Sequence, residues 1–309
     1  MRVFIAGATG AIGRPLVPML REAGHEVTGM TRSEERAQGL RGVGAQAVVC
    51  DALDGDGVRS AMAEASPEVV IHQLTDLPQE FGMRYGYGAT SRLRTEGTRN
   101  LLEGARAAGA RRFVAQSIAF LYHPGNPPVN DEDARTLAGS PGKFGEAVDA
   151  VIELERTVTG AGGMDGLALR YGFFYGPGTW YAPGTKLART VKRRWFPIIG
   201  DGSGVFSYIH IDDAASATVA AVERGSPGVY NIVDDEPAPT REWLPVLAEA
   251  LGAKPPRQVP MWLGRLVAGT NAEFAGAKMR GASNAKAKRE LGWTPRYASW
   301  RQGFREGLA

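Results

Sequence analysis

The chain has 309 residues, a length that favours one large domain together with a smaller one over a single core. Hydrophobic residues make up 43% of it and charged residues 22%, a balance that is typical of globular proteins and excludes a disordered chain. The net charge of +3 is spread along the sequence, so we expect no nucleic-acid partner.

The single cysteine, Cys50, excludes an internal disulfide and indicates a reducing compartment. It lies in the apolar run 47–50, which favours a buried structural thiol over a nucleophile. No apolar run approaches membrane-spanning length, and the N-terminus lacks the layout of a signal peptide. We therefore expect a cytoplasmic protein with no membrane partner.

Short apolar runs alternate with segments of helical periodicity through the first half of the chain. Strands are predicted at 2–6, 26–31, 46–50, 69–72, 112–116 and 167–170, and helices at 12–23, 33–40, 57–64, 94–108 and 139–155. Strands that alternate with helices imply right-handed crossovers. This predicts an α/β fold with a doubly wound parallel sheet covered on both faces by helices.

The pattern changes after Tyr171, where glycine, proline and aromatic residues become frequent. Helices are predicted at 211–223, 240–251, 262–268 and 285–291, and a strand at 229–233. We expect the main domain to comprise residues 1–171 plus about 205–225. A smaller C-terminal domain would comprise about 172–204 plus 226–309.

Three glycines follow the first strand at a spacing of three and lead into the first helix. Gly7 permits the tight turn, Gly10 lets the backbone approach a pyrophosphate, and Gly13 lets the helix pack close to the strand. The helix N-terminus then offers free N–H groups to phosphate oxygens. The motif predicts a dinucleotide site formed by Gly7, Thr9, Gly10, Ala11, Ile12 and Gly13.

The end of the second predicted strand indicates which dinucleotide is bound. Arg32 lies there, next to Thr31 and Ser33, and can pair with a 2′-phosphate, so NADP(H) is favoured over NAD(H). The alternative for Arg32 is a solvated surface charge. Asp51, with Ala52 beside it, is placed to accept a hydrogen bond from the adenine amino group, although a turn aspartate is also expected in such a position.

Beyond the glycines, the ordered motifs include Val-Ile-His-Gln-Leu-Thr at 70–75, Phe-Val-Ala-Gln-Ser at 113–117 and Arg-Tyr-Gly-Phe-Phe-Tyr-Gly-Pro at 170–177. With these, nearly the whole chain resembles the short-chain dehydrogenase/reductase superfamily, in its extended branch of NAD-dependent epimerases and dehydratases. The resemblance implies a Rossmann-type NAD(P)-binding domain and a smaller C-terminal substrate-binding domain. It also implies that the cofactor crosses the strand ends beside Leu74, with its nicotinamide near Ser117 and Tyr171.

Typical members of the family use a serine and a Tyr-x-x-x-Lys pair, in which the tyrosine moves a proton at a substrate oxygen. When Glu155 is placed on the family's glutamate, Ala147 falls at the tyrosine and Val151 at the lysine. The family's asparagine falls near Arg94 and Thr95. The usual mechanism therefore does not transfer to this chain.

The family's ligands for a nucleotide sugar are also replaced. Phe173 stands at the asparagine and Phe206 at the arginine that bind such substrates in the family. Phenylalanine cannot hold a diphosphate but suits an apolar or aromatic molecule. We therefore expect Phe173, Phe174, Trp180 and Phe206 to bind the substrate.

Three residues are candidates for the chemistry. Ser117 would bind a substrate oxygen, and Tyr122 would supply a proton, with simple packing as the alternative. Lys143 could reach the cleft from the helix start, with a solvated side chain as the alternative. No cluster has metal-ligand spacing, so no metal is expected.

Together these features predict an atypical NADP(H)-dependent oxidoreductase that reduces a carbonyl or activated alkene of a small apolar or aromatic metabolite. One alternative is an epimerase, dehydratase or isomerase with tightly bound NAD(P). Another is a non-catalytic NADP(H)-binding regulator. The expected partner is a small-molecule substrate, and a homodimer through two packed helices is common in such folds.

Overall fold

The computed structural model describes residues 1–78 and 86–309. Its centre is a sheet of seven parallel strands in the order β12-β7-β5-β4-β1-β2-β3. The strands are β1 (Arg2–Ala6), β2 (Glu26–Thr31), β3 (Gln46–Val49), β4 (Val69–His72), β5 (Arg112–Ile118), β7 (Asp165–Tyr171) and β12 (Gly228–Ile232). The predicted doubly wound sheet is confirmed.

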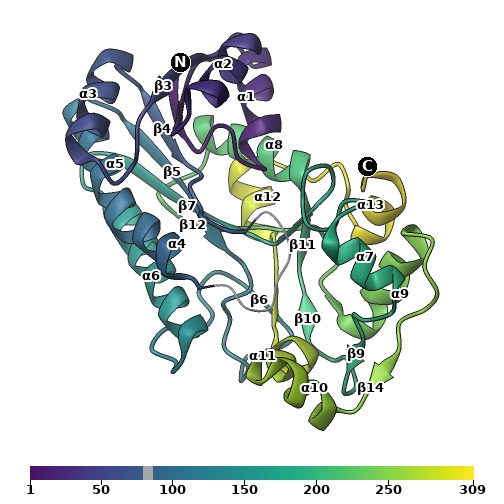
Figure 1. Ribbon diagram of the computed structural model, residues 1–309. Coiled ribbons are helices and arrows are strands. Elements are labelled where there is room, and N and C mark those ends of the chain that lie inside the picture. The colour runs from purple at the N-terminus through teal and green to yellow at the C-terminus, as the bar shows by residue number, and fades with distance from the viewer. Residues whose placement is uncertain (79–85) are drawn as a thin grey trace.

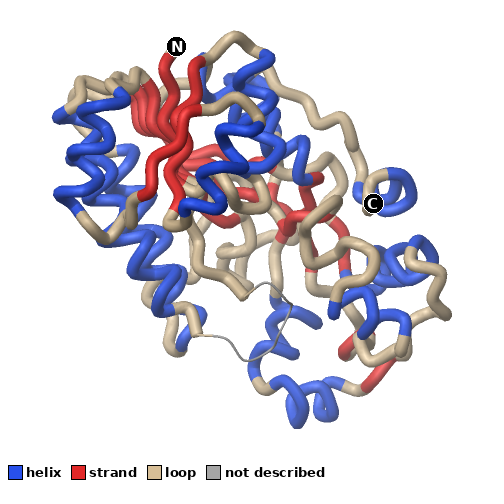
Figure 2. The backbone as a smooth tube through the Cα atoms, turned by 45° about the horizontal axis from the view of Figure 1, so that its top comes forward, coloured by secondary structure: helices blue, strands red, loops and turns tan. Residues whose placement is uncertain are grey.

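Helices cover both faces of the sheet, as Figures 1 and 2 show. One face packs on α1 (Gly13–Glu22), α2 (Glu34–Gly42), α8 (Ile211–Glu223) and α12 (Ala285–Leu291). The other packs on α3 (Gly55–Ala65), α5 (Thr98–Ala107) and α6 (Lys143–Thr159). Alternate residues of β1 supply the two cores: Val3 and Ile5 point to the first, and Phe4 and Ala6 to the second.

The helix expected at 94–108 begins earlier and changes its winding on the way. It consists of α4 (Gly88–Arg92), a π-helical turn η1 (Leu93–Gly97) and then α5. The Thr90 hydroxyl bonds both backbone groups of Asp76, at 2.9 and 3.0 Å, and so ties the start of this helix to the end of the segment after β4. The π-turn rotates the side chains that follow α4 relative to an uninterrupted helix.

A separate core surrounds the buried Trp243, where Tyr175, Tyr208 and Phe304 pack together. Around it lie α7 (Lys186–Lys192), α9 (Thr240–Ala250) and α13 (Trp300–Glu306), which Figure 1 shows away from α3 and α5. The remaining helices are α10 (Met261–Ala268), α11 (Thr270–Glu273) and the π-turn η2 (Phe274–Lys278). Short strands are β6 (Val129–Asn130), β8 (Phe173–Tyr175), β9 (Ile198–Ile199), β10 (Val205–Phe206), β11 (Tyr208–His210), β13 (Ala238–Pro239), β14 (Gln258–Val259) and β15 (Gly281–Ala282).

One part of the expected domain division is corrected by the strand pairing. The segment 226–309 was assigned to the smaller domain, but β12 pairs with β7 from Gly228↔Leu167 to Ile232↔Tyr171. The strand β12 is therefore the edge strand of the central sheet and belongs to the main domain. By sequence alone, a short apolar run such as 229–233 fits either domain. The strand with which it pairs decides to which domain it belongs.

Candidate active site

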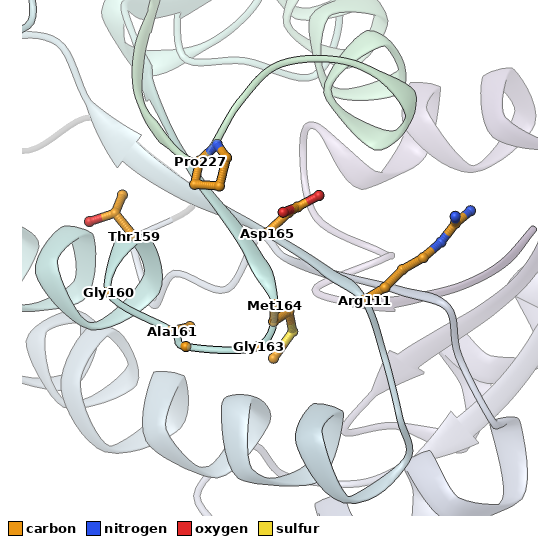
Figure 3. A pocket seen from close by; sticks show the side chains of 9 residues that line it. Arg111, Thr159, Gly160, Ala161, Gly163, Met164, Asp165 and Pro227 are labelled. Carbon is orange, nitrogen blue, oxygen red and sulfur yellow. The ribbon is translucent and has the colours of Figure 1, made fainter.

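A cavity of about 1020 Å³ lies along the carboxyl ends of the central strands. It begins at the turn after β1, passes the ends of β2, β3 and β4, and reaches the ends of β5 and β7. Between β1 and β4 the strand order reverses, and ligands of open α/β sheets bind in the crevice at such a point. A smaller hollow of about 520 Å³, between Arg111, Asp165, Pro227 and the loop after α6, lies at the opposite strand ends (Figure 3).

The glycine-rich turn forms one end of the large cavity. Gly7 has φ +92°, and a Cβ on it would lie 2.8 Å from the carbonyl oxygen of Gln73, so the two switch-point loops touch. The backbone N–H of Gly10 donates to the Gly7 carbonyl at 3.0 Å and closes the turn. Gly7, Thr9, Gly10, Ala11 and Ile12 line the cavity as expected.

Gly13 acts by packing rather than by lining the cavity. A Cβ there would lie 2.3 Å from the Ala8 carbonyl oxygen, so only glycine lets α1 start this close to the turn. No side chain caps α1. Arg14 and Leu16 donate to the Gly10 and Ile12 carbonyls and Pro15 has no N–H, so the first turn of α1 leaves the Gly13 N–H for the cavity end. Such a terminus binds phosphate.

Arg32 lines the cavity at the end of β2, and so does Arg36; that Arg32 pairs with a 2′-phosphate stays a prediction. Ser33 caps α2 by accepting from the Arg36 N–H at 3.4 Å, which places Arg36 in the first helical turn. We did not predict Arg36, although its position four residues after Arg32 on a capped helix was a usable signal.

The ends of β3 and β4 supply the next part of the wall. Cys50, Asp51, Ala52 and Leu74 all line the cavity. The Asp51 carboxylate accepts from the Leu53 N–H at 3.0 Å, so it shapes its own turn while it faces the cavity. Burial raises the pKa of the Cys50 thiol, which fits a structural thiol.

Ser117 lines the inner end of the cavity, but its hydroxyl is already used. It donates to Glu155 Oε1 at 2.6 Å, and the same carboxylate receives two hydrogen bonds of 2.7 Å from Arg170. All three side chains are buried. While this bond is formed the single hydroxyl proton cannot be donated to a substrate oxygen, so the expected role of Ser117 is corrected to a structural one.

Tyr122 is fully buried and is not among the residues that line the cavity. Its hydroxyl donates to Asn231 Oδ1 at 2.7 Å and accepts from Arg170 Nη1 at 3.1 Å. Burial raises the pKa of Tyr122 to about 12. The structure contradicts the proton-donor interpretation of Tyr122 and fits the packing alternative.

Tyr171 lines the cavity as expected, at the end of β7, but its hydroxyl faces the protein. Thr218 donates to the Ala214 carbonyl, so the Tyr171 hydroxyl donates to Thr218, at 2.7 Å, and accepts from Gln73 Nε2, at 3.1 Å. Burial raises the pKa of Tyr171 well above its usual value. Tyr171 therefore contributes its ring to the cavity wall, while its hydroxyl is bonded within the protein.

Helix α6 presents Phe144 and Ala147 to the cavity. Lys143 is its exposed first residue and does not line the cavity, which corrects its candidate role and fits the solvated alternative. Val151 is buried in the core below. An alanine thus lies where the resemblance places the family's tyrosine.

Aromatic rings form a further part of the cavity wall. Phe173, Phe174 and Trp180 line the cavity as expected, and Phe120, which we did not predict, stacks on Phe173 with ring centroids 4.4 Å apart. Phe206 does not line the cavity. It packs against Phe173, with the two ring centroids 5.0 Å apart. Its expected contact with the substrate is therefore corrected to support of Phe173.

Charge is unevenly divided along the cavity. Among the lining residues that the structure describes, four are arginines (Arg14, Arg32, Arg36 and Arg94) and two are aspartates (Asp51 and Asp76). Arg14 and Arg94 were missed as cavity residues because neither belongs to the glycine motif or a strand end.

Across residues 1–78 and 86–309, no group of acidic, histidine or cysteine side chains could hold a metal ion. The same residues contain no helix with the length and apolar character of a membrane span.

Comparisons with known proteins agree with this geometry. A model of the NAD dependent epimerase/dehydratase family matches residues 3–233. A 3-diazoavenalumate denitrifying reductase from a Streptomyces species is 48% identical over 312 residues, which cover 98% of this chain and 99% of that protein. A 2-alkyl-3-oxoalkanoate reductase from Stenotrophomonas maltophilia is 27% identical and covers 82% of this chain and 76% of its own. The UDP-glucose 4-epimerase of Thermotoga maritima has a similar structure, with a TM-score of 0.78, 21% identity and coverage of 100% and 97%.

Proposed function

The chain belongs to the NAD-dependent epimerase/dehydratase family, and from this premise we propose that it is an NADPH-dependent reductase of a small aromatic substrate. It is an enzyme of the oxidoreductase/epimerase type. The observation that carries the proposal is the inner end of the cavity. There, beside the ends of β5 and β7, Ile118, Phe120, Phe173 and Phe174 line the cavity, and the hydroxyls of Ser117 and Tyr171 are engaged within the protein.

The residues of the outer cavity fit a dinucleotide. Gly10, whose added Cβ would meet only the Gly7 carbonyl oxygen, would let the backbone approach a pyrophosphate, and the start of α1 would offer the Gly13 N–H to it. Asp51 faces the adenine end, and Tyr171 would hold the nicotinamide with the flat side of its ring. When bound, the reduced cofactor supplies hydride. The protein then has to place the substrate and exclude water.

We assign the preference for NADPH to Arg32 and Arg36. Arg32→Ala should raise the Kd for NADPH about 10–100-fold and leave that for NADH nearly unchanged, because each charge-assisted hydrogen bond to the 2′-phosphate contributes about 1.5–3 kcal/mol. Nicotinamide fluorescence titration measures both constants. Arg106→Ala, an exposed arginine of α5 outside the cavity, is the control. Equal binding of NADPH and NADH by the wild-type protein would remove the assignment.

The reaction that best suits a cavity in which the hydroxyls of Ser117 and Tyr171 are held by the protein is one that needs no proton. The Streptomyces relative is named for a diazo substrate and for denitrification. Hydride transfer to an aryl diazonium ion forms a C–H bond, breaks the C–N bond and releases N₂, and atoms and charge balance without an acid. Carbonyl reduction, in contrast, leaves an oxyanion that a protein acid or water must protonate. We therefore favour the diazonium reaction over the carbonyl or alkene reduction expected from sequence.

An NADPH oxidation assay tests this proposal directly. With benzenediazonium as substrate, loss of nicotinamide absorbance should match formation of the arene, and deuterium from C4-labelled NADPH should appear in the product ring. Benzaldehyde of equal concentration should be reduced much more slowly. Turnover of the aldehyde without turnover of the diazonium ion would overturn the proposed reaction.

The epimerase alternative predicts a different result in the same preparation. A cofactor that co-purifies with the protein and is regenerated in each turnover would give no net NADPH loss. Phe173, which lines the cavity, disfavours a sugar diphosphate there, because it cannot pair with phosphate. A homodimer through two packed helices remains part of the proposal.

A further inference from the structure

The helix α10 carries apolar side chains that face away from the protein. Trp262 is 64% exposed and Leu266 75%, and Leu263 beside them is exposed as well. Gly264 marks the packed side of the helix, since a Cβ on it would lie 2.5 Å from Ile199 Cγ2. Positions 262 and 266 are two residues away on either side, so their side chains project about 160° from the packed side. The helix therefore presents an apolar stripe to its surroundings.

Another exposed tryptophan lies on the segment next to this helix. Trp195 is 68% exposed and follows the end of α7. The chain then enters β9, which pairs with β14 just before α10, so these segments belong to one corner of the molecule. Arg194 Nε ties them together by donating to the Pro255 carbonyl at 2.9 Å. Figure 1 shows α10, β14 and β9 together, far from α3.

The charge of these two segments has one sign. Residues 192–200 and 253–269 contain six lysines and arginines and no aspartate or glutamate. Four of the cations are exposed: Lys192, Arg193, Lys254 and Arg257. The acids next to them along the chain are Asp201, Glu249 and Glu273, and the last two pair with Arg305 and Arg265, respectively. Positive charge therefore exceeds negative charge in this part of the chain.

The combination of cations with apolar side chains decides which partner fits. A second copy of the chain would bring like charges together, which opposes association. Nucleic acid would neutralise the cations, but it would leave Leu263 and Leu266 in water, because it offers phosphates and flat bases. An anionic lipid surface suits both features, since its head groups attract lysine and arginine and its interface accepts tryptophan and leucine.

We propose that the surface formed by residues 192–195 and 254–266 binds an anionic membrane. The helix α10 lies in the plane of the interface, with Trp262 and Leu266 inserted among the lipids and the cations at the head groups. The expectation of no membrane partner rested on the lack of an apolar run of spanning length. A helix that lies on the membrane needs no such run.

Co-sedimentation of the intact protein with vesicles tests this proposal. Wild type should bind phosphatidylcholine vesicles that contain about 30% phosphatidylserine at least about tenfold more tightly than vesicles of phosphatidylcholine alone. Trp262→Ser with Leu266→Ser should weaken binding to the mixed vesicles about 10–100-fold, because the inserted apolar area is lost. Lys254→Gln with Arg257→Gln should weaken it about 10–30-fold and leave binding to phosphatidylcholine unchanged.

Matched variants elsewhere serve as controls. Arg99→Gln with Arg106→Gln removes two exposed charges of α5, and Val43→Ser removes an exposed apolar side chain after α2. Both should bind vesicles as wild type does. All the replaced side chains are exposed, so the variants should unfold at the wild-type temperature.

Three results overturn the proposal. The first is no binding of wild type to the mixed vesicles, and the second is equal binding by wild type and the two surface variants. The third is the discovery of another partner: a DNA duplex bound in place of the vesicles, or a dimer that the Trp262→Ser, Leu266→Ser variant no longer forms.

Discussion

Replacing Glu155 with leucine is expected to lower the free energy of unfolding by about 3–5 kcal/mol. Glu155 and Arg170 are each 4% exposed and share two hydrogen bonds of 2.7 Å, so the substitution leaves a guanidinium buried without its carboxylate. Ser117 loses its acceptor as well. Denaturant unfolding followed by tryptophan fluorescence measures the loss.

Two further variants separate this effect from a general intolerance of leucine. Glu153→Leu changes an exposed glutamate of the same helix and should shift stability by less than about 0.5 kcal/mol. The double variant Glu155→Leu with Arg170→Met removes both charges and should recover part of the loss, because neither ion is then stranded. If Glu155→Leu is as stable as Glu153→Leu, the buried pair does not hold this region together.

Gly13→Ala is expected to weaken NADPH binding by about 5–150-fold. The new Cβ would lie 2.3 Å from the Ala8 carbonyl oxygen, which is backbone and cannot rotate away, so α1 has to move from the turn. Overpacking of this kind costs about 1–3 kcal/mol, and the strain falls on the turn that we propose for the pyrophosphate. Fluorescence titration with NADPH measures the loss of affinity.

Gly39→Ala is the control for this second substitution. Gly39 lies inside α2 with no atom within 4 Å of its added Cβ, so alanine should raise stability by about 0.5–1 kcal/mol and leave the Kd unchanged. If Gly13→Ala does not fold, Gly10→Ala tests the same turn, since its Cβ meets only the Gly7 carbonyl at 3.2 Å. Wild-type affinity in both turn variants would rule out this cofactor position.

The central sheet could be predicted because its strands are short apolar runs with turn residues at both ends. The strand β1 has the bounds that were expected, 2–6, and β4 has 69–72. The place of β12 could not be predicted, because Val229 to Ile232 would suit any buried strand, and its pairing with β7 is formed over about 60 residues of chain. The π-turn at Leu93–Gly97 gave no signal either, since its residues also fit an ordinary helix.

The outer cavity was predictable for a related reason. Its wall is built largely from the backbone of the glycine turn and of the strand ends, and local sequence patterns reveal both. The inner end depends on partners that are distant in the chain. Tyr122 meets Asn231, and Ser117 meets Glu155, so neither hydroxyl is available although each lies near the expected position. Arg94 was placed near the family's asparagine, but its burial in the cavity required the fold.

Cys50 gives the molecule a practical property. It is the one thiol of the sequence, and it lies in the wall of the cavity beside Asp51. A fluorophore or spin label attached there would sit at the end of the cavity that we propose for the adenine, without any change to the sequence. Because the raised pKa slows alkylation at neutral pH, labelling at higher pH is the practical route. If a bound dinucleotide blocks the labelling of Cys50, the labelled fraction measured by mass spectrometry reports how much of the site is occupied.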